Sequence, residues 1–214
     1  MFRTVAMSLI CVAAGVTAGC LQKETSHTIY LAPDGAASWV ISELNVRSDA
    51  EQGARIAEEQ AFIGAALLGS HGAARGLAAL HPQGLVRTTV LRDERPFQVV
   101  TDARFASVDQ LLERFFTELG IRTSSSLTVD GFRTTLRVQL DFSRPLPERK
   151  SDAAELAETF DRFRFVLTDG RFDTVTGFDV VDGASATLSS DWLERADLAS
   201  ESGGRVDLML SWTR

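Results

Sequence analysis

The chain is 214 residues long, with 44% hydrophobic and 24% charged residues. This balance is typical of a protein that buries a core, and it excludes a wholly disordered chain. The formal net charge of −7 argues against non-specific binding to nucleic acid or to an anionic lipid surface. The length fits one or two domains of ordinary size.

Residues 1–19 have the three parts of an export signal. Arg3 supplies positive charge, an apolar run extends from Val5 to Val16, and small residues precede Cys20. The apolar run is roughly 12 residues, whereas a helix needs about 20 to cross the hydrocarbon of a bilayer. We therefore predict a cleaved signal peptide over residues 1–19 rather than a permanent transmembrane anchor.

The segment Val16-Thr17-Ala18-Gly19-Cys20 resembles the lipobox of bacterial lipoproteins, in which small residues precede an invariant cysteine. The resemblance implies that a diacylglyceryl group is transferred to the Cys20 sulfur and that the chain is cleaved after Gly19. It usually also implies acylation, for example by palmitate, of the new amino terminus. Thr17, Ala18 and Gly19 would be read by the signal peptidase, although Thr17 stands where the family most often has an aliphatic residue.

Lipidation of Cys20 also agrees with the cysteine content of the chain. Cys11 lies in the leader, so the mature chain would keep one cysteine, which cannot form an internal disulfide. Two or three acyl chains, at ~0.8 kcal/mol per buried methylene, anchor a protein stably. Leu21 follows the cysteine, where aspartate marks inner-membrane retention in enteric bacteria, so we expect the outer membrane, facing the periplasm.

We expect residues 20–25 to form the lipidated cysteine and a short tether, and residues 26–214 to form a single α+β domain. Asp-Gly pairs between alternating runs predict β-hairpins, and they occur at 34–35, 130–131, 169–170 and 182–183. The clearest strand is 132–142, with apolar side chains on one face. The other strand candidates are 27–32, 37–46, 85–92, 97–105, 125–129, 164–168, 171–178, 180–188 and 205–212.

Helices are predicted from capping patterns and apolar stripes. Ser48 with Glu51, Ser107 with Gln110, and Asp152 with Glu155 have the spacing of a capping box. The three apolar stripes that follow are Ile56, Ile63 and Leu67; Val108, Leu111, Leu112, Phe115, Phe116 and Leu119; and Leu156, Phe160 and Phe163. A short fourth helix should include Trp192, Leu193 and Ala196.

These elements predict an α+β fold. We expect a mainly antiparallel β-sheet of about nine strands built from hairpins, with about four amphipathic helices packed on one face. No proline-rich or glycine-rich linker divides residues 26–214 clearly, and the best loop is 143–150.

No catalytic, metal-binding or cofactor-binding residues stand out, so we expect none. His71 and His81 are ten residues apart, which matches no zinc spacing, and loop or helix-end positions explain them better. Acidic residues such as the series Asp152, Glu155, Glu158 and Asp161 have the spacing of a solvated helix face.

Two residue groups leave alternatives open. The chain has thirteen phenylalanines and one tyrosine. Either the phenylalanines fill a core, or some of them line a cavity for an acyl chain or another apolar ligand. The second group is the strand-face arginines, which dock an anionic partner or form the solvated side of a sheet beside aspartates on neighbouring strands. The arginines are Arg133, Arg137, Arg171 and Arg205, and the aspartates are Asp141, Asp173 and Asp207.

The sequence therefore predicts a membrane-anchored protein of the bacterial envelope that binds or scaffolds another component without catalysis. It predicts no nucleic-acid partner, and it leaves the protein or apolar ligand open. The alternatives are a carrier of a lipid or other apolar ligand and a hydrolase of envelope polymers or lipids. The hydrolase requires two acids, or a serine, a histidine and an acid, to converge in one cleft.

Overall fold

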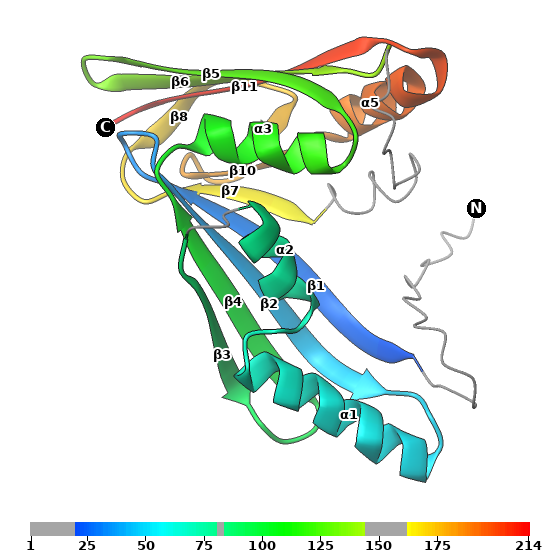
Figure 1. Ribbon diagram of the computed structural model, residues 1–214. Helices are drawn as coiled ribbons and strands as arrows, with labels where there is room; N and C mark the ends of the chain where they lie inside the picture. The colour runs from blue at the N-terminus through cyan, green and yellow to red at the C-terminus, as the bar shows by residue number, and fades with distance from the viewer. Residues whose placement is uncertain (1–19, 81–83, 144–161) are drawn as a thin grey trace.

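Residues 20–80, 84–143 and 162–214 are described by a computed structural model, in which the strands form two separate sheets (Figure 1). Of the described residues, 48% lie in strands and 28% in helices. One sheet has seven strands and the other has four.

The seven-stranded sheet is dominated by a long antiparallel hairpin that the Asp34-Gly35 turn closes. Its strands are β1 (Leu21–Leu31), β2 (Ala37–Ser48), β3 (Val86–Arg92), β4 (Phe97–Phe105), β7 (Phe163–Leu167), β9 (Phe178–Val180) and β10 (Ser185–Leu188). They follow the order β3-β4-β2-β1-β7-β10-β9. The β1–β7 pair is parallel, and the other pairs of this sheet are antiparallel.

The four-stranded sheet is antiparallel throughout, in the order β5-β6-β11-β8. Its strands are β5 (Arg122–Asp130), β6 (Arg133–Asp141), β8 (Arg171–Thr176) and β11 (Arg205–Thr213). The alternation predicted for 132–142 is confirmed, because Thr134, Leu136, Val138 and Leu140 are buried. Phe132 is the exception at 80% exposure, since it stands in the turn before β6.

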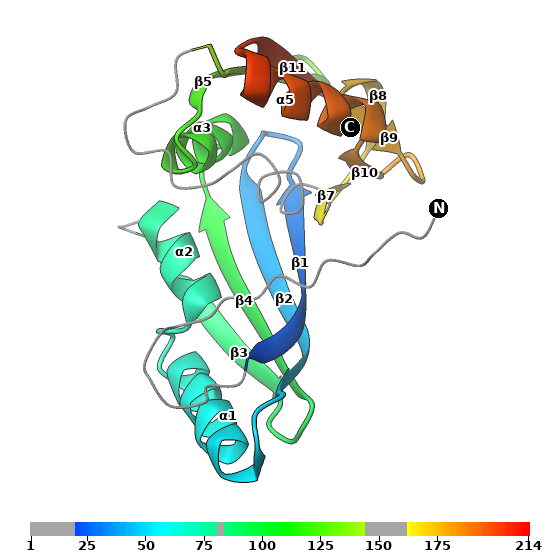
Figure 2. The ribbon, with the colours of Figure 1, turned by 90° about the vertical axis from the view of Figure 1, so that its right-hand side faces the viewer.

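The helices divide between the two sheets. They are α1 (Gln52–Leu67), α2 (Gly72–Leu80), α3 (Val108–Glu118) and α5 (Ser190–Ser202). Figure 2 shows α1 and α2 on one side of the seven-stranded sheet, where they contact β2, β3 and β4. By contrast, α3 contacts β5 and β6, and α5 contacts β11.

A continuous core joins the upper part of the long sheet to the inner face of the four-stranded sheet. It contains all three tryptophans, Trp39, Trp192 and Trp212, each at most 2% exposed. A smaller apolar cluster of Val46, Val99 and residues of α1 lies at the other end of the long sheet. The molecule is therefore elongated, with most of its buried apolar surface at one end (Figure 1).

The predicted fold class is wrong in its central feature. The helices do not pack together on one face of a single sheet, because the chain changes sheets repeatedly. The Asp169-Gly170 pair, predicted to close a hairpin, instead connects β7 of one sheet to β8 of the other. The hairpins at Asp34-Gly35, Asp130-Gly131 and Asp182-Gly183 are confirmed.

Two glycines mark places where the chain passes between sheets. Gly170 has φ +89°, and a Cβ built there would lie 2.0 Å from the carbonyl oxygen of Thr213. Gly177, between β8 and β9, has φ +79°, and its Cβ would lie 2.7 Å from atoms of Trp192 and Leu208. Both positions need the left-handed region and also lack room for a side chain.

The helix predictions are partly confirmed. Helix α3 begins after Ser107 and buries most of its predicted stripe, and α5 contains the predicted Trp192. The cap at Ser48 is wrong, because Ser48 ends β2 and α1 starts after Glu51. Helix α2 was not predicted. The helix expected after Asp152 lies outside the described residues.

Two further expectations need correction. The stripe predicted for α1 is correct only at Ile63, which packs against the smaller apolar cluster, since Ile56 is 48% and Leu67 72% exposed while Phe62 and Ala66 are buried. Residues 21–25, expected to be part of a tether, form the first half of β1 and pair with β2.

Candidate functional site

Cys20 is the residue immediately before β1, at the end of the long sheet that also carries α1 (Figure 1). Its backbone N–H donates to Oδ1 of Asp49 at 2.6 Å, and the Asp49 N–H donates back to the Cys20 carbonyl oxygen at 3.3 Å. The Gln22 side-chain amide donates to the second oxygen of the same carboxylate at 3.3 Å. Cys20 is therefore fixed to the end of β2 rather than placed on a loose segment.

The strand opposite Cys20 is itself braced. Ser48 is buried, and its N–H donates to Oε1 of Glu59 on α1 at 3.0 Å. Arg95, in the β3–β4 turn, forms an ion pair with the same oxygen of Glu59 at 3.1 Å and donates to the Ser48 carbonyl oxygen at 3.4 Å. The Glu59 carboxylate thus ties α1, β2 and the β3–β4 turn together beside the cysteine.

The geometry fixes how far the cysteine lies from the opposite end of the sheet. Ala32, at the β1–β2 turn, comes twelve positions after Cys20. At about 3.3 Å per residue of strand, this corresponds to roughly 40 Å.

Thr17, Ala18 and Gly19, predicted to guide signal-peptide cleavage, lie outside the described residues.

A buried polar cluster lies between the long sheet and the start of α2. Glu43 on β2 is 1% exposed, His71 is 4% and Thr101 on β4 is 0%. The imidazole Nε2 of His71 lies 3.0 Å from the Thr101 hydroxyl and 3.1 Å from Oε2 of Glu43. Lys23, at a bulge in β1, forms an ion pair with the other carboxylate oxygen of Glu43.

This cluster does not have the geometry of a nucleophile–histidine–acid relay. In such a relay the acid and the nucleophile contact different ring nitrogens. Here Nε2 of His71 faces both Glu43 and Thr101, while Nδ1 has no partner within the described part of the chain. Burial lowers the pKa of His71, although the nearby Glu43 carboxylate opposes this shift. The cluster therefore joins β2, β4 and α2 as a structural element.

Sequence reasoning missed this cluster, although one signal was present. In the alternating run 37–46, the inward positions are Ala37, Trp39, Ile41 and then Glu43. A carboxylate in the apolar half of a strand pattern indicates a buried charge, which must be paired. Its partner His71 was expected at a loop or helix end, which is confirmed, since it precedes α2.

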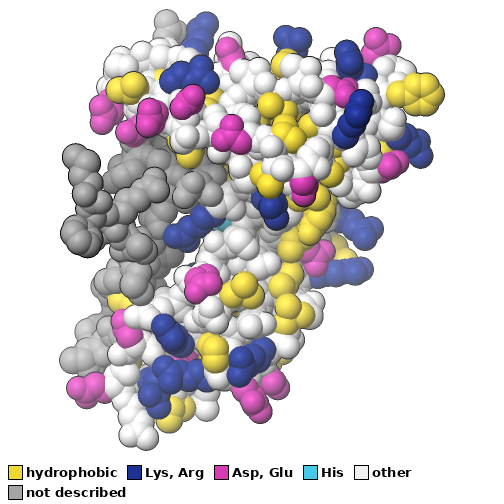
Figure 3. All heavy atoms as spheres, turned by 180° about the vertical axis from the view of Figure 1, so that it is seen from behind, with side chains coloured by type: hydrophobic (Ala, Val, Ile, Leu, Met, Phe, Trp, Pro, Cys, Tyr) yellow, Lys and Arg dark blue, Asp and Glu magenta, His cyan; other side chains and the backbone are white. Residues whose placement is uncertain are grey.

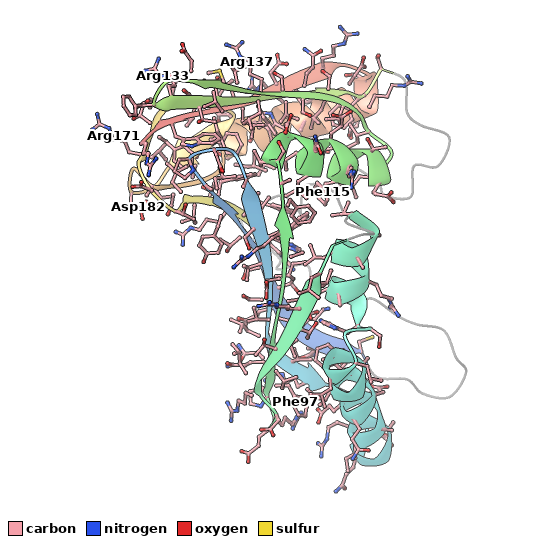
Figure 4. All side chains as sticks on the ribbon, turned by 60° about the vertical axis from the view of Figure 1, so that its left-hand side comes forward. Phe97, Phe115, Arg133, Arg137, Arg171 and Asp182 are labelled. Atoms are coloured by element: carbon pink, nitrogen blue, oxygen red, sulfur yellow. The ribbon has the colours of Figure 1, made fainter. Side chains whose placement is uncertain are left out.

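An aromatic cluster surrounds His27 on β1. The His27 ring stacks on Phe163 with centroids 4.8 Å apart and an interplanar angle of 7°. The Trp39 indole N–H donates to His27 Nδ1 at 3.3 Å. Phe115 of α3, labelled in Figure 4, packs edge-on against Trp39. Burial, together with the positive charges of Arg162 and Lys23, lowers the pKa of His27 to about 4.

The depressed pKa of His27 predicts a pH-dependent stability. In the unfolded chain the imidazole takes up a proton below about pH 6.5, whereas in the folded chain it stays neutral down to about pH 4. The free energy of unfolding should therefore fall by up to about 3 kcal/mol as the pH drops through this window. Urea unfolding curves at pH 7, 6, 5 and 4.5 would measure the loss.

The matched variant for this prediction is His27→Asn, which keeps an acceptor near the Trp39 indole and cannot be protonated. Its stability should change less than that of the wild type between pH 6.5 and 4. Parallel stability curves for the two proteins would contradict the assignment to His27.

The strand-face arginines lie on the outer side of the four-stranded sheet, as Figure 4 shows for Arg133, Arg137 and Arg171. Arg133 pairs with Asp173 at 3.6 Å, and Arg205 pairs with Asp141 at 3.0 Å. The expected cross-strand aspartates are thus present, and this face has the character of a solvated, ion-paired surface.

The phenylalanines mostly fill the core. Eight of those described are buried: Phe62, Phe105, Phe116, Phe142, Phe163, Phe165, Phe172 and Phe178. Phe97 and Phe115 are half-buried, and Phe97 sits with the smaller apolar cluster near the Cys20 end (Figure 4). This arrangement favours the core interpretation for the described phenylalanines.

A surface pocket of about 430 Å³ lies between α2 and α3 and is lined by Glu113, Arg114 and Glu118. The two glutamates are five residues apart, so they point about 140° apart around the helix. Glu113 also accepts a hydrogen bond from the Ser125 hydroxyl at 3.0 Å. These acids do not converge in the way that the hydrolase alternative requires.

Within residues 20–80, 84–143 and 162–214, no three histidine, cysteine or acidic side chains are grouped closely enough to hold a metal ion. None of the helices in these ranges combines the length and apolar character needed to cross a bilayer. His81 and the acidic series from Asp152 lie outside the described residues.

The sequence matches no protein family and no curated protein. Among solved structures, the NMR structure of the folded domain of LppM from Mycobacterium tuberculosis is similar at 11% sequence identity, covering 95% of each chain with a TM-score of 0.38. A superposition this loose supports no assignment of fold or function.

Proposed function

We propose that this chain is a bacterial envelope lipoprotein, anchored by acyl chains on Cys20, whose folded part binds or scaffolds another envelope component without catalysis. The observation that carries the proposal is the position of the lipobox-like segment. Its cysteine is the residue directly before β1, where a modified amino terminus would begin the folded part.

The absence of a tether gives this anchor a structural consequence. Lipid on Cys20 would sit against a strand end braced by Asp49, and through Ser48 and Glu59 by α1. The long sheet would then stand with its Cys20 end at the bilayer and its β1–β2 turn about 40 Å away. Such an arrangement suits a module that presents a distal surface to a partner.

The non-catalytic assignment draws on the described polar groups. The buried Glu43–His71–Thr101 cluster lacks relay geometry, and the acids of the α2–α3 pocket diverge. Leu21 after the cysteine favours the outer membrane, facing the periplasm. Density-gradient separation of inner and outer membranes would test this location, and recovery with the inner membrane would contradict it.

The anchor is tested by Cys20→Ser, with Cys11→Ser as the matched control in the leader. The Cys20→Ser chain should remain full length and lose all incorporation of a labelled fatty acid, because it has no sulfur to acylate. Cys11→Ser should be processed and labelled like the wild type. Mass spectrometry of the wild-type amino-terminal peptide should show it starting at an acylated Cys20, and persistent label on Cys20→Ser would refute the proposal.

A further inference from the structure

A pocket of about 470 Å³ opens at the end of the long sheet opposite to Cys20, beside the β1–β2 turn. It lies on the face of β1, β2 and β4 that points away from α1 and α2. Figure 3 shows this side of the molecule, with hydrophobic side chains gathered along its middle. The half-buried Val40, Val100 and Val166 contribute to that face.

The pocket arises from the strand register. Tyr30 on β1 pairs with Ser38 on β2, and Ser38 pairs with Arg104 on β4, so the three side chains form one row across the sheet. Strands are about 4.8 Å apart, which places Tyr30 and Arg104 roughly 10 Å apart on either side of a serine. Ala32, Ala36 and Ala106 add single methyl groups to the lining, and Ala37, Phe105 and Thr168 complete it.

The two walls differ in chemistry. Tyr30 is 39% exposed and offers an aromatic ring with a hydroxyl group. Arg104 is exposed, and within the described part of the chain its guanidinium makes no ion pair or hydrogen bond. It differs in this from Arg133, Arg205 and Arg95, which all pair with carboxylates. Among the described residues that line the pocket, Arg104 is also the one charged side chain.

We propose that this pocket binds a small amphipathic monocarboxylate, with its carboxylate on Arg104 and its apolar body over the alanine floor against Tyr30. A planar guanidinium matches a carboxylate with two parallel hydrogen bonds. The volume lies within the range of small-molecule sites. A single positive charge balances one carboxylate, whereas a phosphate dianion would need further donors or cations.

The pocket is separate from the anchor. It lies roughly 40 Å along β1 from Cys20, so its ligand would be reached from the aqueous side rather than from the bilayer. Binding is measured independently of acylation, and failure of one proposal therefore leaves the other testable.

The test uses the processed, full-length protein extracted from membranes in detergent, with micelles alone as the blank. Isothermal titration calorimetry with 3-phenylpropanoate should show saturable binding at millimolar or lower concentration. Arg104→Gln should weaken binding at least tenfold, and Ser38→Leu should abolish it by filling the gap between Tyr30 and Arg104. Arg87→Gln, on the same sheet face but outside the pocket, should bind within twofold of the wild type.

Four outcomes would overturn the inference. They are no saturable binding to the wild type, an equal loss in Arg87→Gln and Arg104→Gln, equal affinity for the uncharged 3-phenylpropanamide, and tighter binding of phenyl phosphate. Both arginines are exposed, so we expect unchanged urea unfolding midpoints. A loss of binding would then reflect the pocket rather than the fold.

Discussion

Replacing Trp192 with alanine should lower the free energy of unfolding by about 4 kcal/mol, the largest effect that we expect of a single apolar substitution. Trp192 is completely buried between α5 and β11, and its indole N–H donates to the Asp207 carbonyl oxygen at 3.1 Å. Gly177 lies beside the same ring, since a Cβ built on it would be 2.7 Å from Trp192. Alanine would therefore leave a cavity and an unpaired carbonyl oxygen. It would also remove the side chain that packs against the β8–β9 connection, where the chain passes from one sheet to the other.

Urea unfolding followed by far-ultraviolet circular dichroism would measure this loss. Trp192→Phe should cost less, since it keeps a ring and loses only the N–H donor. Leu198→Ala on the same helix is the control, because Leu198 is 64% exposed and its loss should change stability by less than about 0.5 kcal/mol. A cost below about 1 kcal/mol for Trp192→Ala would show that α5 is not held by this side chain.

The strands could be predicted from the sequence because the alternation of apolar and polar residues reflects which side chains of a strand are buried. The run 97–105 was predicted with the bounds that β4 has, and 37–46 falls within β2. In β4 of one sheet and β6 of the other, buried side chains alternate with more exposed ones, as the pleat of a strand requires. The Asp-Gly pairs likewise predict a turn but not the partner of the next strand, which is why Asp169-Gly170 was misinterpreted.

The helices were predicted less well where tertiary contacts determine whether a segment is helical and which of its faces is buried. Helix α2 contains Gly72 and Gly76, which oppose helix formation in isolation. It forms because Ala74, Leu77 and Leu80 pack under the long sheet. In α1 the apolar residues occur on two faces of the helix. The ion pair between Glu59 and Arg95 fixes which of these two faces points toward the sheet.

The candidate sites also differ in whether a local sequence pattern or the tertiary structure defines them. The lipobox-like segment is a local pattern, so the sequence could single out Cys20. The pocket near the β1–β2 turn combines residues of β1 and β2 with residues of β4 that come more than 60 positions later in the chain. Its small floor residues have no distinctive local pattern, and the register of three strands is needed to bring them together.

The polar cluster around Glu43 leads to the second large effect. Glu43 is almost completely buried, and its carboxylate is held by Lys23 on one side and faces His71 on the other. Removing one partner of a buried ion pair leaves the remaining charge uncompensated. The Lys23 side chain is 29% exposed and can regain water, so we expect Glu43→Ala to cost about 3 kcal/mol, at the lower end for such pairs.

A double-mutant cycle separates the charge pair from simple loss of packing. If Lys23 is stranded when Glu43 is removed, the double variant with Lys23→Met should be more stable than the summed single effects by at least about 1 kcal/mol. Asp102→Asn, on the opposite face of the adjacent β4, is the control and should change the free energy of unfolding by less than about 0.5 kcal/mol. Additive losses in the cycle would show that the Glu43 carboxylate contributes through His71 and Thr101 rather than through Lys23. A cost equal to that of Asp102→Asn would show that the cluster does not hold α2 against the sheet.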